Sequence, residues 1–204
     1  MNGKFFDLKK EKQDRMINAA LKVFALNGYR HASTDDIVRE AGVIKGLLFH
    51  YFGNKLGVYQ FVYDYSVRYM ALELNTGMST KTTDLFEVLK QMQTAWMNAV
   101  KGYPYIQQFL ARATLEDTGE ILMYISQKKE ILESACEEVH SQIDYSALPY
   151  GVDGRKLCRM LEHAADGLIT EHFGDASFQA DMALEEIIGY IDQVKNLVYR
   201  HTPV

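Results

Sequence analysis

The sequence contains little proline and little cysteine, with 3 prolines and 2 cysteines in 204 residues. Because proline interrupts helices, long segments without it indicate an all-helical chain. Cys136 and Cys158 do not belong to a Cys-x-x-Cys motif. We therefore expect no disulfide framework, and we interpret both cysteines as small buried hydrophobic residues of a protein in a reducing cytoplasm.

Long hydrophobic runs and a leader-like N-terminus are also lacking. No stretch of about 18 apolar residues occurs, so we expect no membrane span. The first residues do not combine a charged start with an apolar run and a cleavage site. The hydrophobic content of 48% is ordinary for a globular protein, and a chain of this length can bury a core without covalent staples.

Net positive charge is lacking as well, since the formal net charge is −5. This value taken alone argues against binding to nucleic acid. Residues 1–60, however, contain ten Lys and Arg against six Asp and Glu, and residues 61–204 contain twelve against twenty-one. A basic head on an acidic body is typical of local contact with a polyanion, and the segment Lys4–Lys12 adds to it as a basic arm.

Helical periodicity and stop signals divide the chain into about nine helices. In the first of these, Ile17, Ala20, Leu21 and Phe24 form one apolar stripe, and Asn27-Gly28 ends it. The expected helices are 8–26, 33–41, 44–52, 55–75, 84–101, 105–115, 120–143, 155–173 and 178–201. We therefore predict an all-α fold, with a three-helix head over residues 1–54 and a helical body over residues 55–204.

The second and third helices have the spacing of a helix-turn-helix motif. Ser33 is the expected N-cap of the second helix, and Gly42 breaks that helix. In the next stretch, GVIKGLLFHYFGNK, Leu48 and Phe52 are four residues apart and are expected to face the core of the head. Lys45, Gly46, Phe49 and His50 then lie on the other side, with Leu47 and Tyr51 flanking them.

The segment Arg15–Lys55, RMINAALKVFALNGYRHASTDDIVREAGVIKGLLFHYFGNK, resembles the DNA-binding head of TetR-type (TetR/AcrR) transcriptional regulators. The resemblance in sequence covers about the first 60 residues, and the body resembles the family in layout alone. It implies a ligand-responsive repressor that binds a pseudo-palindromic DNA operator as a homodimer. It also implies a body that binds a small, largely apolar inducer. No cofactor and no metal are expected.

The resemblance implies a role for each matching residue of the motif. Ser33 and Thr34 would contact phosphates at the start of the second helix. Lys45 is the first polar contact of the recognition helix, Gly46 lies beside the DNA backbone, and Lys55 grips a phosphate. His50 and Tyr51 are the two ring positions that reach phosphates and base edges.

Three positions depart from the family pattern. Ile44 and Leu47 stand where Ser or Thr is frequent, and Phe49 replaces a frequent Tyr. Fewer hydrogen bonds to DNA are then available, so we expect readout through thymine methyl groups and DNA shape, with Leu47 and Phe49 in contact.

Two residue sets in the body are candidate sites. The candidate inducer pocket is apolar with a few polar groups; it comprises Met92, Trp96, Tyr103, Phe109, Met123, Tyr124, Met160 and His163. The candidate dimer interface consists of apolar residues at helical spacing in the last two helices, a pairing that the resemblance implies; it comprises Leu157, Leu161, Leu168, Ile187, Ile191, Val194 and Val198.

Two alternatives remain open at this stage. One is a DNA-bound structural or cell-division factor of the same fold without a small ligand. The other is a metal-dependent enzyme, because helical bundles can hold two-iron sites built from paired Glu-x-x-His motifs. Glu137-x-x-His140 is one such motif, and a second copy is lacking. No P-loop or G-x-G-x-x-G motif occurs either, so an enzyme is not expected.

Overall fold

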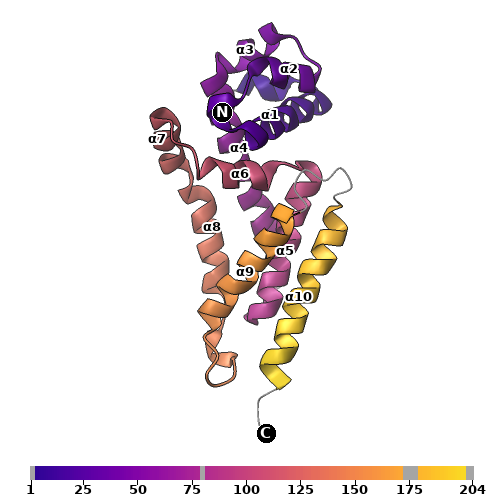
Figure 1. Cartoon of the computed structure of the whole chain (residues 1–204), viewed down its shortest axis with the longest axis vertical. Coiled ribbons are helices and arrows are strands. Elements are labelled where there is room, and N and C mark those ends of the chain that lie inside the picture. Colours follow the sequence, from indigo (N-terminus) through magenta and orange to yellow (C-terminus); the bar gives the residue numbers. More distant parts are fainter. Residues whose placement is uncertain (1–2, 79–80, 172–178, 201–204) are drawn as a thin grey trace. The chain divides into compact units, whose positions relative to one another are not determined.

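A computed structural model of the chain describes residues 3–78, 81–171 and 179–200. These residues form ten α-helices and two short 3-10 helices, as the all-α prediction requires (Figure 1). The α-helices are α1 (Lys10–His31), α2 (Thr34–Ala41), α3 (Lys45–Phe52), α4 (Lys55–Gly77), α5 (Leu85–Gly102), α6 (Ile106–Ala113), α7 (Gly119–Lys128), α8 (Glu130–Ser141), α9 (Gly154–Glu171) and α10 (Ala180–Arg200). The 3-10 helices are η1 (Gly3–Asp7) and η2 (Tyr145–Ala147).

The chain folds into two compact units. Unit 1 comprises Met1–Tyr69 and Gly102–Leu132, and unit 2 comprises Met70–Lys101 and Glu133–Val204. The predicted head, residues 1–54, therefore packs in the same unit as the start of α4, α6 and α7. The functional division at residues 54 and 55 stays a prediction. None of the described helices has the length and apolar character needed to cross a membrane.

Helix α1 follows the predicted stripe, since Ile17, Ala20, Leu21 and Phe24 are all buried. The stop expected at Asn27-Gly28 appears as a kink, because Gly28 has φ 66° and ψ 173° inside a helix that continues to His31. A backbone with these angles is open almost exclusively to glycine. The last residues of α1 therefore leave the direction of the helix.

An aromatic core holds unit 1 together. The ring of Tyr59 in α4 lies 5.0 Å from that of Phe24 in α1 and 5.3 Å from that of Phe109 in α6, measured between centroids. Such edge-on ring contacts stabilise a core beyond the area that they bury. Helix α1 packs against both α2 and α6, so it joins the head to the later part of this unit.

The kinked end of α1 is also fixed by polar contacts to the residues after α6. The backbone N–H of Tyr29 donates to Oε1 of Glu116 over 2.7 Å, and Arg30 pairs with Asp117 at 3.2 Å. The carboxylate of Glu116 satisfies a backbone donor that the kink would otherwise leave without an acceptor. The position of α6 and the path of the chain at Gly28 are therefore coupled.

Unit 2 contains α5, most of α8, and α9 and α10. Helices α9 and α10 pack against each other, and charged side chains connect α5 to α10. Lys195 lies 2.9 Å from Glu87 and 3.4 Å from Asp84, and Lys90 pairs with Asp192. These contacts hold the last helix along the side of α5.

The helix expected over residues 120–143 is divided at Lys129, which explains why ten α-helices are described where about nine were predicted. The buried residues of α7, Ile121 and Ile125, belong to unit 1, and those of α8, Ala135 and Val139, belong to unit 2. The turn between the last two helices, expected around residues 174–175, lies outside the described residues.

Candidate nucleic-acid interface

The helix-turn-helix segment forms as the local sequence predicts. The hydroxyl oxygen of Ser33 accepts a hydrogen bond from the backbone N–H of Asp35 over 3.1 Å and so caps α2. Gly42 ends α2 in the left-handed conformation, with φ 62°. The backbone N–H of Val43 then donates to the carbonyl of Val38 over 3.0 Å, which completes a Schellman-type ending. The cap and the glycine turn fix how α3 follows α2.

Helix α3 divides into a buried side and an exposed side. Leu48 is fully buried, whereas Lys45, Gly46 and His50 are exposed. Leu47, Phe49 and Tyr51 are half-buried, and so is Phe52, which was expected to face the core. The exposed side thus carries Lys45, Gly46 and His50, three of the residues that were predicted to contact DNA.

Phe5 in η1 packs against aromatic side chains of α3, a contact that was not predicted. Its fully buried ring lies 5.2 Å from that of Phe52 and 5.6 Å from that of Tyr51. A weak signal was present in the sequence, since Phe5-Phe6 is an apolar pair inside a basic segment. The predicted basic arm therefore starts as a packed element, and its aromatic residue helps to orient the recognition helix.

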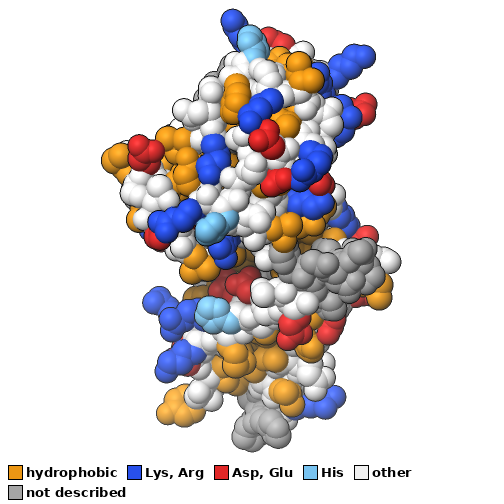
Figure 2. All heavy atoms as spheres, turned by 45° about the horizontal axis from the view of Figure 1, so that its top comes forward, with side chains coloured by type: hydrophobic (Ala, Val, Ile, Leu, Met, Phe, Trp, Pro, Cys, Tyr) orange, Lys and Arg blue, Asp and Glu red, His pale blue; other side chains and the backbone are white. Residues whose placement is uncertain are grey.

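Carboxylates accompany the basic side chains of the head. Lys45 lies 2.8 Å from Asp35, and Lys22 lies 2.6 Å from Glu40. Arg39 is paired with Asp36 one turn earlier in α2. Figure 2 shows acidic side chains among the Lys and Arg side chains in the upper part of the view. The surface at α2 and α3 therefore carries both charges, and Lys45 is neutralised by Asp35 in this structure.

Lys55 has a structural role that was not predicted from the sequence. Its Nζ donates to the backbone carbonyls of Tyr29 at 2.9 Å, Arg30 at 3.3 Å and Ala32 at 3.1 Å. The ammonium also lies 4.6 Å from the centroid of the Tyr29 ring. An ammonium group has three N–H donors, and these carbonyls use all of them. In this structure, Lys55 therefore ties the start of α4 to the end of α1 instead of presenting a free charge to phosphate.

Thr34 lies at the start of α2, and Gly46 lies in the first turn of α3. Thr34 is half-buried in the first turn of α2, beside the capping Ser33. A Cβ atom added at Gly46 would meet no described atom within 4 Å, so this part of α3 is open. Ile44 precedes α3 and is 76% exposed. Its side chain has no group that can cap a helix, and the first N–H groups of α3 remain available to an anion.

The eight candidate pocket residues differ in burial. Met92, Tyr103 and Phe109 are buried in the cores, and Met123, Met160 and His163 are exposed. Trp96 and Tyr124 are half-buried. The candidate inducer pocket stays a prediction.

Tyr103, a member of that set, makes a polar network inside unit 1. Its hydroxyl donates to Oδ1 of Asp14 over 2.7 Å and lies 2.6 Å from the hydroxyl of Tyr65. Burial, together with these hydrogen bonds, raises the pKa of Tyr103 well above its ordinary value. Its role is thus to hold the start of α6 against α1.

Most of the candidate dimer residues lie inside the single chain. Leu157, Leu161, Leu168, Ile187 and Ile191 are already buried within the single chain, and only Val194 and Val198 are half-exposed. The five buried residues bring α9 and α10 into the core of unit 2. The large apolar residues that α9 and α10 expose are Met160, Met182, Tyr190, Leu197 and Tyr199.

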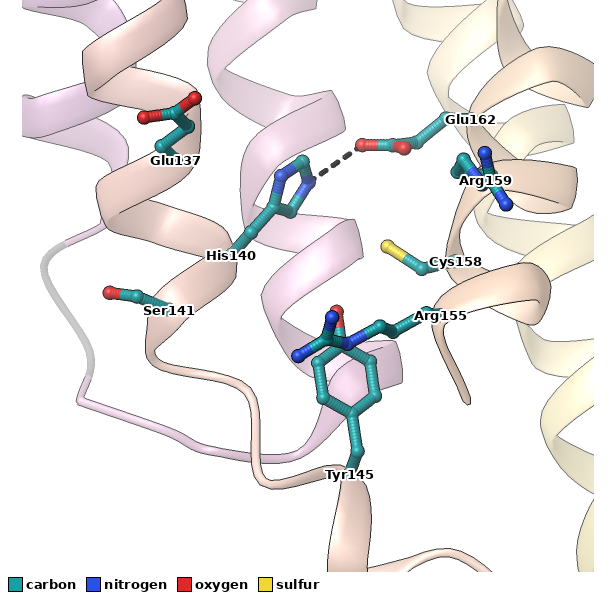
Figure 3. Close-up of a pocket in the computed structure, with 8 residues that line it drawn as sticks. All are labelled: Glu137, His140, Ser141, Tyr145, Arg155, Cys158, Arg159 and Glu162. Atoms are coloured by element: carbon teal, nitrogen blue, oxygen red, sulfur yellow. Dashed lines mark hydrogen bonds and ion pairs between the residues drawn. The ribbon is translucent and has the colours of Figure 1, made fainter. Parts of the chain in front are cut away.

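A pocket of about 610 Å³ lies in unit 2, and most of the side chains that line it carry a polar or charged group. Eight residues line it: Glu137, His140, Ser141, Tyr145, Arg155, Cys158, Arg159 and Glu162 (Figure 3). Nε2 of His140 lies 2.8 Å from Oε1 of Glu162. Hydrogen bonds with Cys158 and with Glu162 raise the pKa of His140 to about 10. This pocket lies outside the predicted residue set, although Glu137-x-x-His140 belongs to it.

Comparison with known proteins assigns the helix-turn-helix segment. Residues 16–60 match the family model of "Bacterial regulatory proteins, tetR family". The HTH-type transcriptional regulator TtgW of Pseudomonas putida is 45% identical over 53 residues, which are 26% of this chain and 40% of that protein. The HTH-type transcriptional regulator SrpR, also of Pseudomonas putida, is 27% identical over 84% of this chain and 80% of its own length. The chain spans only 40% and 38% of the first two curated relatives that it matches.

The fold of most of the chain resembles that of solved regulators. The crystal structure of the TetR family transcriptional regulator PfmR from Thermus thermophilus aligns with a TM-score of 0.62 and 19% identity, over 88% of this chain and 96% of that one. Residues 16–60 therefore match the DNA-binding segment of the TetR family of bacterial regulators, and the chain has the fold of a solved TetR family regulator. These relatives are regulators, in agreement with the expectation that the chain is not an enzyme.

Proposed function

We propose that this protein is a transcriptional repressor that binds a pseudo-palindromic DNA operator as a homodimer and is released by a small molecule. The observation that carries the proposal is the α2–turn–α3 arrangement, whose outer side presents Lys45, Gly46 and His50 within the segment that matches the tetR family model. A recognition helix of this kind lies in the major groove, and its first turn contacts the bases.

Phosphates and bases would be contacted by different parts of the motif. Lys45, the Ser33 hydroxyl and the open N–H groups of α3 are suited to phosphates, which position the protein without reading sequence. His50 offers ring nitrogens to base edges, and Ile44 and Leu47 offer apolar contact to thymine methyl groups. Gly46 lets the backbone of α3 approach the DNA closely, because no side chain intervenes.

Replacing Lys45 with alanine should weaken operator binding and make it less dependent on salt. Removal of one phosphate contact should reduce the slope of log K against log [salt] by about 0.9. The measurement is a titration of labelled duplex, selected from a random library with the wild-type protein, at several salt concentrations. Lys81→Ala is the matched control, because Lys81 is an exposed lysine of unit 2.

Three outcomes of this experiment are informative. A slope that falls in Lys45→Ala and stays unchanged in Lys81→Ala supports the proposed contact. Equal slopes for Lys45→Ala and the wild type would remove Lys45 from the interface. Failure of the wild-type protein to select any duplex would remove the proposal that it is a DNA-binding repressor.

The homodimer would use the exposed side of the last two helices. Met182, Tyr190 and Leu197 recur at helical spacing on one side of α10, and Met160 is exposed on α9. Apolar residues concentrated in this way mark association surfaces. Two copies would present two recognition helices to successive major grooves, about 34–36 Å apart or a multiple of this distance.

Replacing Leu197 with glutamate should convert the dimer to monomers. A buried carboxylate without a partner is costly, and both copies would contribute one. Sedimentation velocity measures the result directly. Leu122→Glu serves as the control, because Leu122 in α7 is 45% exposed and Leu197 is 48% exposed. Dimers that persist in Leu197→Glu would place the interface elsewhere.

Release by a small molecule would be a shift between two arrangements of the dimer. A ligand changes the population of these arrangements only by its difference in affinity for them. The pocket in unit 2 has a volume suited to a small ligand, and its charged lining favours a polar one over the apolar inducer first expected.

A further inference from the structure

Three potential metal ligands meet in the polar pocket of unit 2. His140 comes from α8, and Cys158 and Glu162 come from α9, four residues apart and hence on one side of that helix. One ligand atom from each of the three residues can be chosen so that all three atoms lie within 4.8 Å of one another. Figure 3 shows the imidazole, the sulfur and the carboxylate directed toward a common region between the two helices.

The distances suit a single ion after small side-chain adjustments. In a tetrahedral zinc site the metal lies about 2.0–2.3 Å from each nitrogen, oxygen and sulfur atom, which puts neighbouring ligand atoms roughly 3.5 Å apart. Nε2 of His140 and Oε1 of Glu162 are closer than this, at 2.8 Å, because they are hydrogen-bonded. An ion between them would replace that hydrogen bond and require rotation of two half-exposed side chains.

The kinds of donor atom select the metal. A thiolate and an imidazole favour Zn²⁺ and related transition metals, whereas Ca²⁺ and Mg²⁺ prefer sites made of oxygen atoms. The thiolate of Cys158 and the carboxylate of Glu162 together balance the two positive charges of the ion. Three protein ligands leave a fourth position for water or for another ligand from the pocket.

The remaining charges of the pocket also bear on its occupant. Arg155 and Arg159 line it and disfavour a cation, while the carboxylate of Glu137, one turn before His140, favours one. The Arg155 guanidinium lies 5.9 Å from the centroid of the Tyr145 ring, so it is directed toward that ring. The ligand atoms of His140, Cys158 and Glu162 lie away from the Arg155 guanidinium, as Figure 3 shows.

We propose that His140, Cys158 and Glu162 bind a transition metal ion such as Zn²⁺. The site revises the sequence-based interpretation of Cys158 as a plain core residue. The sequence lacks a second Glu-x-x-His motif, and in this site the ligands from the second helix are of other types. His140 faces a Cys-x-x-x-Glu pair on α9 in place of a second motif. The proposal concerns binding of the ion and holds whether or not the protein represses transcription.

The test uses Co²⁺ as a spectroscopic substitute for Zn²⁺. Purified full-length protein, stripped with a chelator, is titrated with cobalt chloride and then with zinc chloride. We expect a near-ultraviolet sulfur-to-cobalt charge-transfer band that saturates at one ion per chain and disappears when zinc is added. The Cys158→Ser variant should lose this band.

Two further variants keep the test decisive. Glu162→Gln changes a half-exposed side chain and should weaken cobalt binding while the charge-transfer band, which arises from sulfur, remains at saturation. Cys136→Ser is the matched control, because Cys136 is the other thiol of the chain and does not belong to the ligand group. It should bind cobalt as the wild type does.

The results that would overturn the proposal are equally definite. Absence of the band in the wild type, or its loss in Cys136→Ser and persistence in Cys158→Ser, would exclude this site. Thermal stabilisation by sulfate or phosphate but not by zinc would show that the pocket holds an anion at Arg155 and Arg159 instead.

Discussion

Replacing Lys55 with methionine should lower the free energy of unfolding by about 2 kcal/mol, because the variant loses charge-assisted hydrogen bonds to three backbone carbonyls. Methionine keeps the length of the side chain and removes the ammonium. Urea denaturation followed by far-ultraviolet circular dichroism gives the stability. Hydrogen exchange should in addition become faster at the amides of residues 29–33, where the tether ends.

The same variant separates two roles of Lys55. A side chain that contacts phosphate would change the salt dependence of operator binding, as proposed for Lys45. A side chain that ties α4 to α1 would lower stability and leave that salt dependence unchanged. The structure favours the second result. Lys81→Met is the control, since Lys81 is an exposed lysine of unit 2 and lies outside the basic arm. A clear fall in slope with unchanged stability would restore Lys55 to the phosphate contacts.

Replacing Gly28 with alanine should destabilise the protein by about 3 kcal/mol. The backbone angles of Gly28 are almost exclusive to glycine, and forcing another residue into them costs about 1–3 kcal/mol. The new Cβ would also lie 3.2 Å from Nε of Arg112 and 3.3 Å from Oε1 of Glu116. Crowding there disturbs the hydrogen bond from the Tyr29 N–H to Glu116. Urea denaturation measures the loss.

Gly46→Ala is the natural control for this change. Gly46 lies inside α3 with open space around its Cα, and alanine is a better helix former than glycine by about 1 kcal/mol. We expect this variant to be as stable as the wild type or more so. A similar loss in both variants would show that the kink at Gly28 carries no special strain.

Features set by neighbouring residues could be predicted from the sequence. The Ser33 cap, the Gly42 turn and the burial of Leu48 each depend on a few adjacent positions, so the helix-turn-helix could be assigned before the structure was known. The apolar stripe of α1 and the stop near Gly28 are local in the same sense.

Features that depend on residues far apart in the sequence could not be predicted from it. The carbonyls that bind Lys55 lie 23 to 26 residues earlier in the chain, and a lysine beside a helix start resembles a phosphate contact in sequence. The apolar stripe on α9 and α10 was expected to be buried, yet periodicity does not reveal whether a second copy or the same chain covers it. The partner of His140 is 22 residues away, on another helix.

The ion pairs on the head bear on how such a regulator finds its site in a genome. Carboxylates beside Lys45, Lys22 and Arg39 reduce the sequence-independent attraction to DNA, which arises almost entirely from phosphate charge. A genome offers on the order of 10⁶–10⁹ competing sites of that kind. When this non-specific attraction is weaker, a larger share of the regulator molecules is free of non-operator DNA. Fewer copies per cell are then needed to keep an operator occupied.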